Sequence, residues 1–426
     1  IARENLTLTE VGDYQFRFSA PDLASTVSRA ITIRNAAAHK MVITQDVPDT
    51  VSSGLTFSPV LRLQVQDIFD NPVLDSVTTV SATLISGTLQ TLTGATASNS
   101  LGSSFIDFPN LNLAGTTGTK QLRLTATNAG TLVNGTSVDT KQFSLASGTA
   151  HALSVSATVA TVANRATLSD IVVRVVDATG NIIPDSGAQI TASVSGITIS
   201  GTTVRFASSG ISTFSDFVLS GATGTYNLGL TSTGLLGATV SVTVTHGQAS
   251  YITLTSSATA RNAQNLATQP VARIFDADGN LVTTGAQSTQ TVRLSAAGAT
   301  LSGTAAISAS AGIATFSGIS LQGLIGSKTL TAEVSLPSTL SVTSTVVLDF
   351  GNVTSLSLER AAAGAANRIA FTTQPQIALR DSAGNFVTGT AATITFTASP
   401  NATITSGTVA VNTASGIATF AGSFLT

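Results

Sequence analysis

The sequence repeats itself about every 100 residues, and this repeat constrains the fold more than any other feature. Each copy contains an apolar run that ends in Asp, two variable residues, Gly, Asn and a further apolar residue. Four segments carry this phrase, the first of them loosely: 61–73, 172–182, 271–281 and 377–386. Because every copy carries the same pattern, the architecture of one copy predicts that of most of the chain.

Two further phrases follow the first in a fixed order. The second reads Gly-Ile-Ser-Thr-Phe or Gly-Ile-Ala-Thr-Phe, at 210–214, 312–316 and 416–420, with a blurred version at 106–108. The third is a Gly-x-Tyr or Gly-x-Lys opening of an alternating strand, at 118–120, 224–226 and 326–328. This order predicts one structural plan used repeatedly.

Expected strands alternate between apolar and hydroxylated side chains. Clear examples are 14–18, 122–124, 239–244 and 393–397. Thr and Val favour extended backbone, and turn signals such as Thr179-Gly180-Asn181 separate the strands at the spacing typical of a β-sandwich. The chain is therefore predicted to be all-β.

Composition excludes several classes of function. Charged residues make up 9% of the chain, against roughly 25% in typical soluble domains, and the net charge of -2 offers no basic face for a phosphate backbone. No apolar run approaches the roughly 18 residues that a membrane helix needs, and Cys is absent. We expect no nucleic-acid partner, no membrane span in this segment and no cofactor.

The three phrases together resemble the bacterial immunoglobulin-like tandem-repeat domains of large surface proteins, the group that includes the invasin and intimin stalk repeats. The resemblance extends over essentially the whole chain. It implies an all-β chain of tandem immunoglobulin-like Greek-key β-sandwiches in a rod-like array, located outside the cell or on its surface. One departure concerns the tyrosine corner, for which Tyr14 and Tyr226 are suited, because Lys120 and Lys328 stand at the equivalent place in two copies.

The start of the first strand in each copy sets the expected domain boundaries. We predict a closing half-domain at 1–38, whole domains at 39–150, 151–249 and 250–353, and the opening part of a domain at 354–426. The connectors between them are only a few residues long. Short connectors limit bending, so we expect an elongated, semi-rigid array.

The motif at 276–280 admits two interpretations. Asp276, Asp278 and Asn280 place hard oxygens at alternate positions, as a calcium loop does, but the later bidentate Glu is missing. The sister copies have Ala178 and Ala383 at or beside the position of Asp278. The favoured interpretation is a β-turn in which Asp bonds its own backbone and Gly-Asn adopts positive φ.

The two ends of the sequence read as complementary halves of one domain. Residues 1–35 alternate like closing strands, whereas the copy from 354 stops before the closing strands of its sisters. The favoured explanation is a window cut from a longer protein; the other is head-to-tail joining, in which the closing strands of one molecule complete the sandwich of the next. The assembly residues under that hypothesis are Tyr14, Phe16, Phe18, Ile394, Phe396, Ile417 and Phe420.

Repetition, short connectors and low charge favour a structural component of an extracellular filament, stalk or surface layer. Its expected partners are copies of itself or adjacent domains of a longer parent chain. The alternative is an adhesin segment that binds glycan or host protein through a variable loop such as 89–104. An enzyme is not expected, because His39, His151 and His246 lie near three different junctions and form no convergent set.

Overall fold

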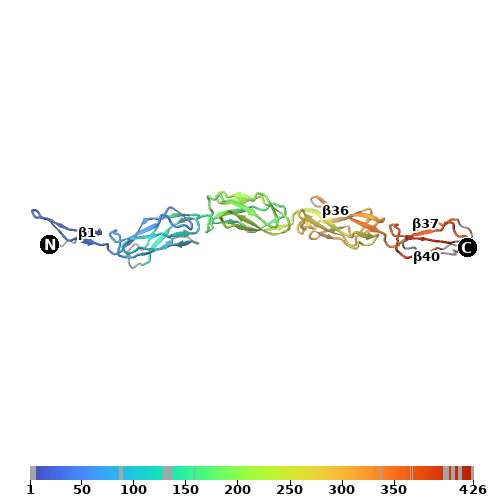
Figure 1. The fold of residues 1–426 in the computed structure, drawn as a ribbon, viewed down its shortest axis with the longest axis horizontal. Coiled ribbons are helices and arrows are strands. Elements are labelled where there is room, and N and C mark those ends of the chain that lie inside the picture. Colours follow the sequence, from blue (N-terminus) through green and yellow to red (C-terminus); the bar gives the residue numbers. More distant parts are fainter. Residues whose placement is uncertain are drawn as a thin grey trace. The chain divides into compact units, whose positions relative to one another are not determined.

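In the computed structural model, the protein consists of strands joined by turns and loops (Figure 1). The structure describes residues 6–85, 90–127, 137–157, 159–335, 338–364, 366, 368–396, 403, 408–410 and 415–423. Within these residues there is no α-helix, and η2 (Ala286–Thr289) is a 3-10 helix. No helix in this described part is long and apolar enough to cross a membrane.

The chain forms two compact units, and each is described by itself. The first unit comprises residues 1–160, 168–217 and 226–242, and the second comprises residues 161–167, 218–225 and 243–426. Strands β18, β25 and β26 of the repeat from 151 have residues in both. The strands of that repeat are β17 (Ala152–Val155), β18 (Val159–Ala163), β19 (Ile171–Val176), β20 (Gln189–Ser193), β21 (Thr198–Ser200), β22 (Val204–Phe206), β23 (Ile211–Phe214), β24 (Val218–Ser220), β25 (Gly224–Thr231) and β26 (Ala238–Thr245).

The first unit begins with two short hairpins and continues into a complete sandwich. The hairpins pair β1 (Gly12–Tyr14) with β4 (Ile31–Ile33), and β2 (Arg17–Phe18) with β3 (Thr26–Val27). The sandwich contains β5 (Lys40–Gln45), β6 (Thr50–Ser52), β7 (Leu61–Gln66), β8 (Thr79–Leu84), β9 (Thr91–Thr93), β10 (Thr96–Ser98), β11 (Phe105–Phe108), β12 (Asn112–Ala114), β13 (Gly118–Lys120), β14 (Leu122–Ala126), β15 (Ser137–Asp139) and β16 (Phe143–Ala146).

The sheets of this sandwich follow from strict alternation. Its larger sheets have the orders β11-β7-β5, β10-β8-β14-β15 and β13-β16-β6, and β12 pairs with β9 in a two-stranded sheet. In β7, Leu61, Leu63 and Val65 are fully buried while the residues between them are not. Since side chains of a strand point alternately to opposite faces, this spacing puts one apolar face of β7 into the core, where Phe108 also lies.

The second unit contains a complete sandwich and an open one. The complete sandwich contains β27 (Ala249–Thr255), β28 (Thr259–Arg261), β29 (Val271–Asp276), β30 (Thr291–Ala297), β31 (Thr300–Ser302), β32 (Ala306–Ser308), β33 (Ile313–Thr315), β34 (Ser320–Gln322), β35 (Gly326–Ser335) and β36 (Thr339–Asp349). Its two main sheets have the orders β27-β29-β33 and β28-β36-β35-β30-β32. When the short strands β28, β31 and β34 are set aside, β27, β29 and β33 are the first, second and fifth strands of this copy. They pair in one sheet, as the first, second and fifth strands of an immunoglobulin domain do.

The last segment has only part of this plan. Its strands are β37 (Ser355–Arg360), β38 (Gln376–Arg380), β39 (Thr393–Thr395), β40 (Thr408–Ala410) and β41 (Ile417–Thr419), in the orders β37-β38-β41 and β39-β40. The predicted fold class, an all-β chain of tandem immunoglobulin-like sandwiches, is confirmed. The rod-like arrangement and the domain boundaries stay predictions.

Candidate functional site at the repeat junctions

The Asp of each repeated motif organises the turn that follows it. One carboxylate oxygen, Oδ1, accepts the backbone N–H groups two and four residues later, each at 2.9 Å, in all four copies. The four residues are Asp67, Asp177, Asp276 and Asp381. The predicted Asp turn is confirmed. Positive φ was expected for both Gly and Asn, but it occurs only at the Gly position, where Asp70 stands in the first copy.

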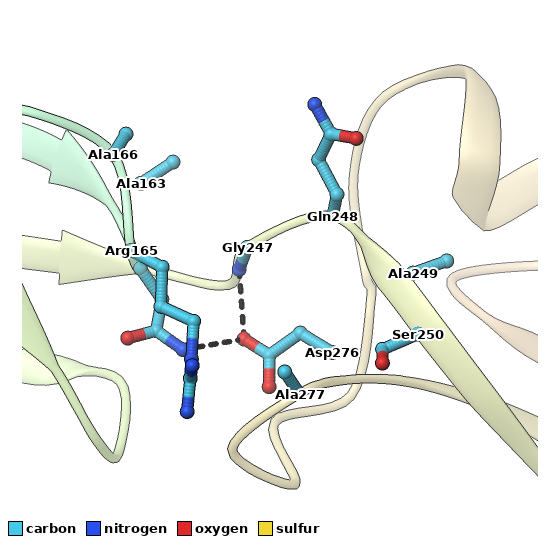
Figure 2. A pocket seen from close by; sticks show the side chains of 10 residues that line it. Ala163, Arg165, Ala166, Gly247, Gln248, Ala249, Ser250, Asp276 and Ala277 are labelled. Carbon is cyan, nitrogen blue, oxygen red and sulfur yellow. Dashed lines mark hydrogen bonds between the residues drawn. The ribbon is translucent and has the colours of Figure 1, made fainter. Parts of the chain in front are cut away.

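The other carboxylate oxygen, Oδ2, binds the connector that enters the repeat. It accepts the N–H of Gly148 in the case of Asp177, and the N–H of Gly247 in the case of Asp276, both at 2.8 Å. Figure 2 shows the second of these bonds. Asp381 binds Gly351 N–H and Asp67 binds Ala36 N–H in the same way, both at 2.9 Å. Each connector is therefore fixed to the motif that follows it.

The Asn of the motif reaches back to a turn in the preceding copy. Its Nδ2 donates to a backbone oxygen there, that of Gly115, Gly221 or Gly323 at 2.8, 2.9 and 2.9 Å. Its Oδ1 accepts a backbone N–H two residues further on, from Thr117, Thr223 or Ile325. The motif Asn that makes these bonds is Asn181 for the first turn, Asn280 for the second and Asn385 for the third. Asn71 makes the same pair of bonds with Thr9 O and Val11 N.

We call this Asp–Asn pair, with its connector and turn contacts, the junction clamp. Within the clamp, Asn Nδ2 also donates to Asp Oδ2, at 2.8 Å for Asn181 and 2.9 Å for Asn385. Because one amide contacts both the carboxylate and the neighbouring turn, the Asp turn, the connector and the preceding copy are linked in one hydrogen-bond network.

A second buried side chain bonds the same turn of the preceding copy. It is Ser53, Asn164 or Asn262, and its oxygen accepts the N–H of Gly115, Gly221 or Gly323 at 3.1, 3.0 and 2.9 Å. All three side chains are buried. The turn glycine is thus bonded through both its N–H and its carbonyl. The connector glycine also lies against this residue: a Cβ on Gly148 or Gly351 would be 2.3 Å from its carbonyl oxygen.

The junction that contains Asp276 carries additional polar contacts. Asn164 Nδ2 donates to Asp276 Oδ2 at 3.0 Å and to Asp278 Oδ2 at 2.6 Å. Arg165 forms a bidentate pair with Asp278 at 2.7 and 2.6 Å. Asn164, Arg165 and Asp276 border a groove of about 520 Å³ (Figure 2). Its lining residues are Ala163, Asn164, Arg165, Ala166, Gly247, Gln248, Ala249, Ser250, Asp276 and Ala277.

Electrostatics agree with a carboxylate held by N–H donors. Burial by itself raises the pKa of Asp177, but hydrogen bonds from Gly148 N–H and from the side chains of Asn181 and Thr179 outweigh it and lower the pKa to about 2. For Asp276 burial again acts upward, and bonds from Gly247 N–H, Asn280 and Asn164 lower the pKa to about 2. Such a charge is stable in a buried place because hydrogen bonds replace its hydration.

The geometry favours the turn interpretation over calcium binding at 276–280. Asp276 Oδ1 accepts the N–H groups of Asp278 and Asn280, and its Oδ2 accepts those of Gly247 and Asn164. Asp278 is engaged by Arg165. Calcium requires several oxygens with free lone pairs, whereas these oxygens already point at donors.

The predicted assembly residues fall into two groups. In the first unit, Tyr14 and Phe16 are half-buried and Phe18 is 59% exposed, and Tyr14 Oη donates to Glu10 O at 3.2 Å. In the second unit, Ile394 and Phe420 are buried and Phe396 is half-buried. Their roles in assembly stay predictions.

The second-unit group borders an apolar groove. Ile394, Phe396 and Phe420 line a space of about 160 Å³ together with Leu356 and Leu358, while Ile417 pairs with Ala378 beside it. The rings of Phe396 and Phe420 lie 5.3 Å apart. The groove is therefore an apolar surface made by both sheets of the last copy.

The groove is open where the equivalent surface of other copies is covered. Leu356 pairs opposite Leu379 in β38, as Ile252 pairs opposite Ile274 in β29. Ile252 is 4% exposed, and β27, which carries it, contacts β36. Leu356 is 57% exposed and Leu358 is 62% exposed. In the copy of β27, strand β36 lies beside this surface, whereas the described residues of the last copy include no strand in the place of β36.

Sequence reasoning identified the Asp turn but missed the junction clamp. The missed residues are the motif Asn, the connector Gly, and the Ser or Asn that binds the turn. One signal was available: the motif Asn recurs in all four copies, even in the first, where Asp70 replaces Gly. A turn alone requires positive φ at one position and does not require that Asn.

Neither a family model nor a curated protein matches this sequence. Solved structures similar to it include extracellular cadherin domains 1–5 of protocadherin gamma B2, with 12% identity over 97% of this chain and 80% of that one, and a TM-score of 0.33. Domains 1–4 of protocadherin gamma B7 match with 14% identity, 79% and 83% coverage, and a TM-score of 0.36. Domains 1–4 of Drosophila N-cadherin match with 12% identity, 81% and 85% coverage, and a TM-score of 0.28.

Proposed function

We propose that this protein is a structural component of an extracellular filament, stalk or surface layer of the bacterial invasin and intimin kind. The observation that supports the proposal is the junction clamp, which recurs at four junctions and fixes each connector and each preceding turn to the following copy. A protein that maintains a spacing needs its joints held in this way. The proposal includes no catalytic activity.

The clamp suits an extracellular role because it depends on neither thiols nor metal coordination. Its bonds are formed by carboxylate, amide and backbone groups, and the carboxylates remain charged far below neutral pH, with a pKa of about 2 at Asp177 and Asp276. Such joints are insensitive to the redox state and calcium level of the surroundings.

A test is to measure how widely the distance between two adjacent copies varies. Paired spin labels on exposed positions of adjacent copies, such as Thr119 and Thr202, would report it by pulsed electron resonance. We expect a narrow distribution in the native protein and a broad one in an Asp177→Ala, Asn181→Ala double variant. Asp107→Ala, which removes an exposed ion pair with Arg62, is the matched control and should leave the distribution narrow. A native distribution as broad as that of the double variant would contradict the proposal.

The open groove supports a second element of the proposal, head-to-tail completion. Strands β1 and β4 pair, and the chain between them forms the β2–β3 pair. Exposed apolar residues on this hairpin are Phe18 of β2, Val27 of β3 and Ile31 of β4. We propose that such a hairpin from a second molecule covers Leu356 and Leu358, since uncovered apolar surface and sheet edges favour association.

Sedimentation over a range of protein concentrations tests this element. Polymers should grow with concentration, and deletion of residues 1–38 or the Leu356→Arg variant should abolish them. The exposed Leu55→Arg is the control, because Leu55 is 47% exposed in another copy. A protein that stays monomeric at all concentrations would refute head-to-tail completion without affecting the clamp.

An adhesin role is the alternative proposal. Within the expected binding loop, 89–104, Leu89 lies outside the described residues and Leu101 is 71% exposed. Phe105, the first residue of β11 directly after this loop, is 41% exposed. Exposed apolar side chains on a loop are suited to ligand contact. Saturable glycan or host-protein binding that Leu101→Ala weakens would favour this role over the structural one.

A further inference from the structure

The motif Asn of each clamp contacts the preceding copy through backbone atoms, and at one junction Asp276 also accepts a hydrogen bond from the Asn164 side chain. The Asn amide donates to a backbone oxygen and the Asn oxygen accepts a backbone N–H, at every one of the four junctions. Within the preceding copy itself, Ser53, Asn164 or Asn262 binds a backbone N–H of the same turn. What the clamp recognises is therefore the path of the turn.

Side chains at the recognised positions differ while the bonds stay the same. The oxygen belongs to Thr9 in the first junction and to Gly in the others, and the N–H belongs to Val11, Thr117, Thr223 or Ile325. The distance from Asn Nδ2 to the backbone oxygen stays between 2.7 and 2.9 Å. Aliphatic Val or Ile and hydroxylated Thr are therefore equivalent at the position that supplies the N–H.

The clamp also tolerates differences in sequence length. The Asn and the oxygen that it binds are separated by 62, 66, 59 and 62 residues at the four junctions. The connector N–H and its Asp are separated by 31, 29, 29 and 30 residues. Insertions within a copy therefore leave the recognised groups in place.

We infer that each clamp is a general socket: it accepts the turn of any other copy of this repeat, in any order along the sequence. The partner is a turn that presents one backbone carbonyl and, two residues later, one backbone N–H. In the three turns that begin with Gly, a Ser or Asn of the same copy accepts the N–H of that Gly. Copies can then be removed, added or reordered without loss of the junction. This goes beyond the proposed structural role, which needs only the native order.

Deleting residues 151–249 from this protein tests the inference. The deletion joins Ala150 to Ser250 and keeps 29 residues between Gly148 and Asp276, the native value for Gly247 and Asp276. The new junction pairs the Gly115 turn with Asn280, and Ser53 takes the place of Asn164. Amide hydrogen exchange of Thr117 and Gly148 reports whether the foreign clamp forms.

We expect Thr117 and Gly148 amides to keep protection within about threefold of the undeleted protein. The same deletion with Asn280→Ala should lose the protection of Thr117 at least tenfold, which shows that Asn280 supplies it. Core amides of the two flanking copies, those of Val65 and Ile274, give the folding control. Free exchange at Thr117 and Gly148 would overturn the inference, and so would loss of core protection, because the socket would then have failed to accommodate a foreign neighbour.

Discussion

Asn385 donates a hydrogen bond of 2.9 Å from its side-chain amide to the backbone oxygen of Gly323, which lies 62 residues earlier in the sequence. The bond joins the turn that follows β34 to the motif that follows β38. A motif that reads locally as a β-turn is therefore a joint between two copies. Asn385 is 5% exposed, so little water could take its place if its side chain were removed.

Removing this side chain should weaken the junction. We expect Asn385→Ala to lower the free energy of unfolding of the last copy by about 1–3 kcal/mol, because Gly323 O, Ile325 N–H and Asp381 Oδ2 lose a partner. Chemical denaturation measures the change. Asn227→Ala, at an exposed position of β25, should cost under about 0.5 kcal/mol. Equal effects of the two variants would contradict a specific role for Asn385.

Acid should loosen the junctions at a defined pH. The folded-state pKa values of Asp177 and Asp276 are about 2, below the ordinary 3.8. A lowered folded pKa stabilises the fold above the unfolded pKa, and this contribution is lost as the pH falls from about 4 toward 2. Each carboxylate should contribute on the order of 2 kcal/mol at neutral pH.

Thermal unfolding between pH 7 and pH 2 measures this dependence. Tm should be flat from pH 7 to about 5 and fall below about 4, and Asp276→Asn should reduce the fall because it cannot titrate. A native Tm that does not change down to pH 2 would show that these carboxylates do not support the fold.

The connector glycines should not tolerate a methyl group. A Cβ on Gly247 would lie 2.7 Å from the carbonyl oxygen of Asn164, closer than van der Waals contact permits. We expect Gly247→Ala to cost about 1–3 kcal/mol and to speed exchange of the residue 247 amide. Gly187→Ala is the control, since the nearest atom to its added Cβ lies at 4.0 Å. If both variants unfold at the same temperature as the native protein, the close approach has no energetic role.

The core should depend on its buried phenylalanines. Phe316 is 1% exposed within the core of the copy that contains β27 to β36. Phe316→Ala should cost about 3–5 kcal/mol in that copy, because transfer energy is lost and a cavity remains. Phe206→Ala, at 67% exposure, should have little effect. Calorimetry would separate the two, and a loss under about 1 kcal/mol at Phe316 would contradict the core assignment.

Chelation should leave stability unchanged. The carboxylate oxygens of Asp276 already accept hydrogen bonds, and Asp278 pairs with Arg165. Neither EDTA nor millimolar calcium should then shift Tm by more than about 1 °C, since an ion stabilises only what it binds. A clear rise in Tm with calcium would revive the calcium loop at 276–280.

The strands were predictable because their signal is local. Val271–Asp276 alternates along a few residues, and the structure buries every second side chain of that strand. The Asp turn was predictable for the same reason, since its donors lie two and four residues away. The clamp was not predictable in this way. Asn280 bonds Gly221 and Thr223, which lie 59 and 57 residues earlier, and backbone atoms leave no mark in a sequence.

The parallel pairing of β28 with β36 has a mechanical consequence. Thr259 lies opposite Val347 and Arg261 opposite Asp349, and β36 leads directly into the connector held by Asp381. Tension applied to the two ends of this copy pulls β28 and β36 in opposite directions along their length. The force then acts on all their backbone bonds in shear, and they must break together rather than one after another. β6 and β16 have the same parallel pairing. Pulling experiments should therefore find a high unfolding force in these copies and a much lower one for the antiparallel hairpin of β1 and β4.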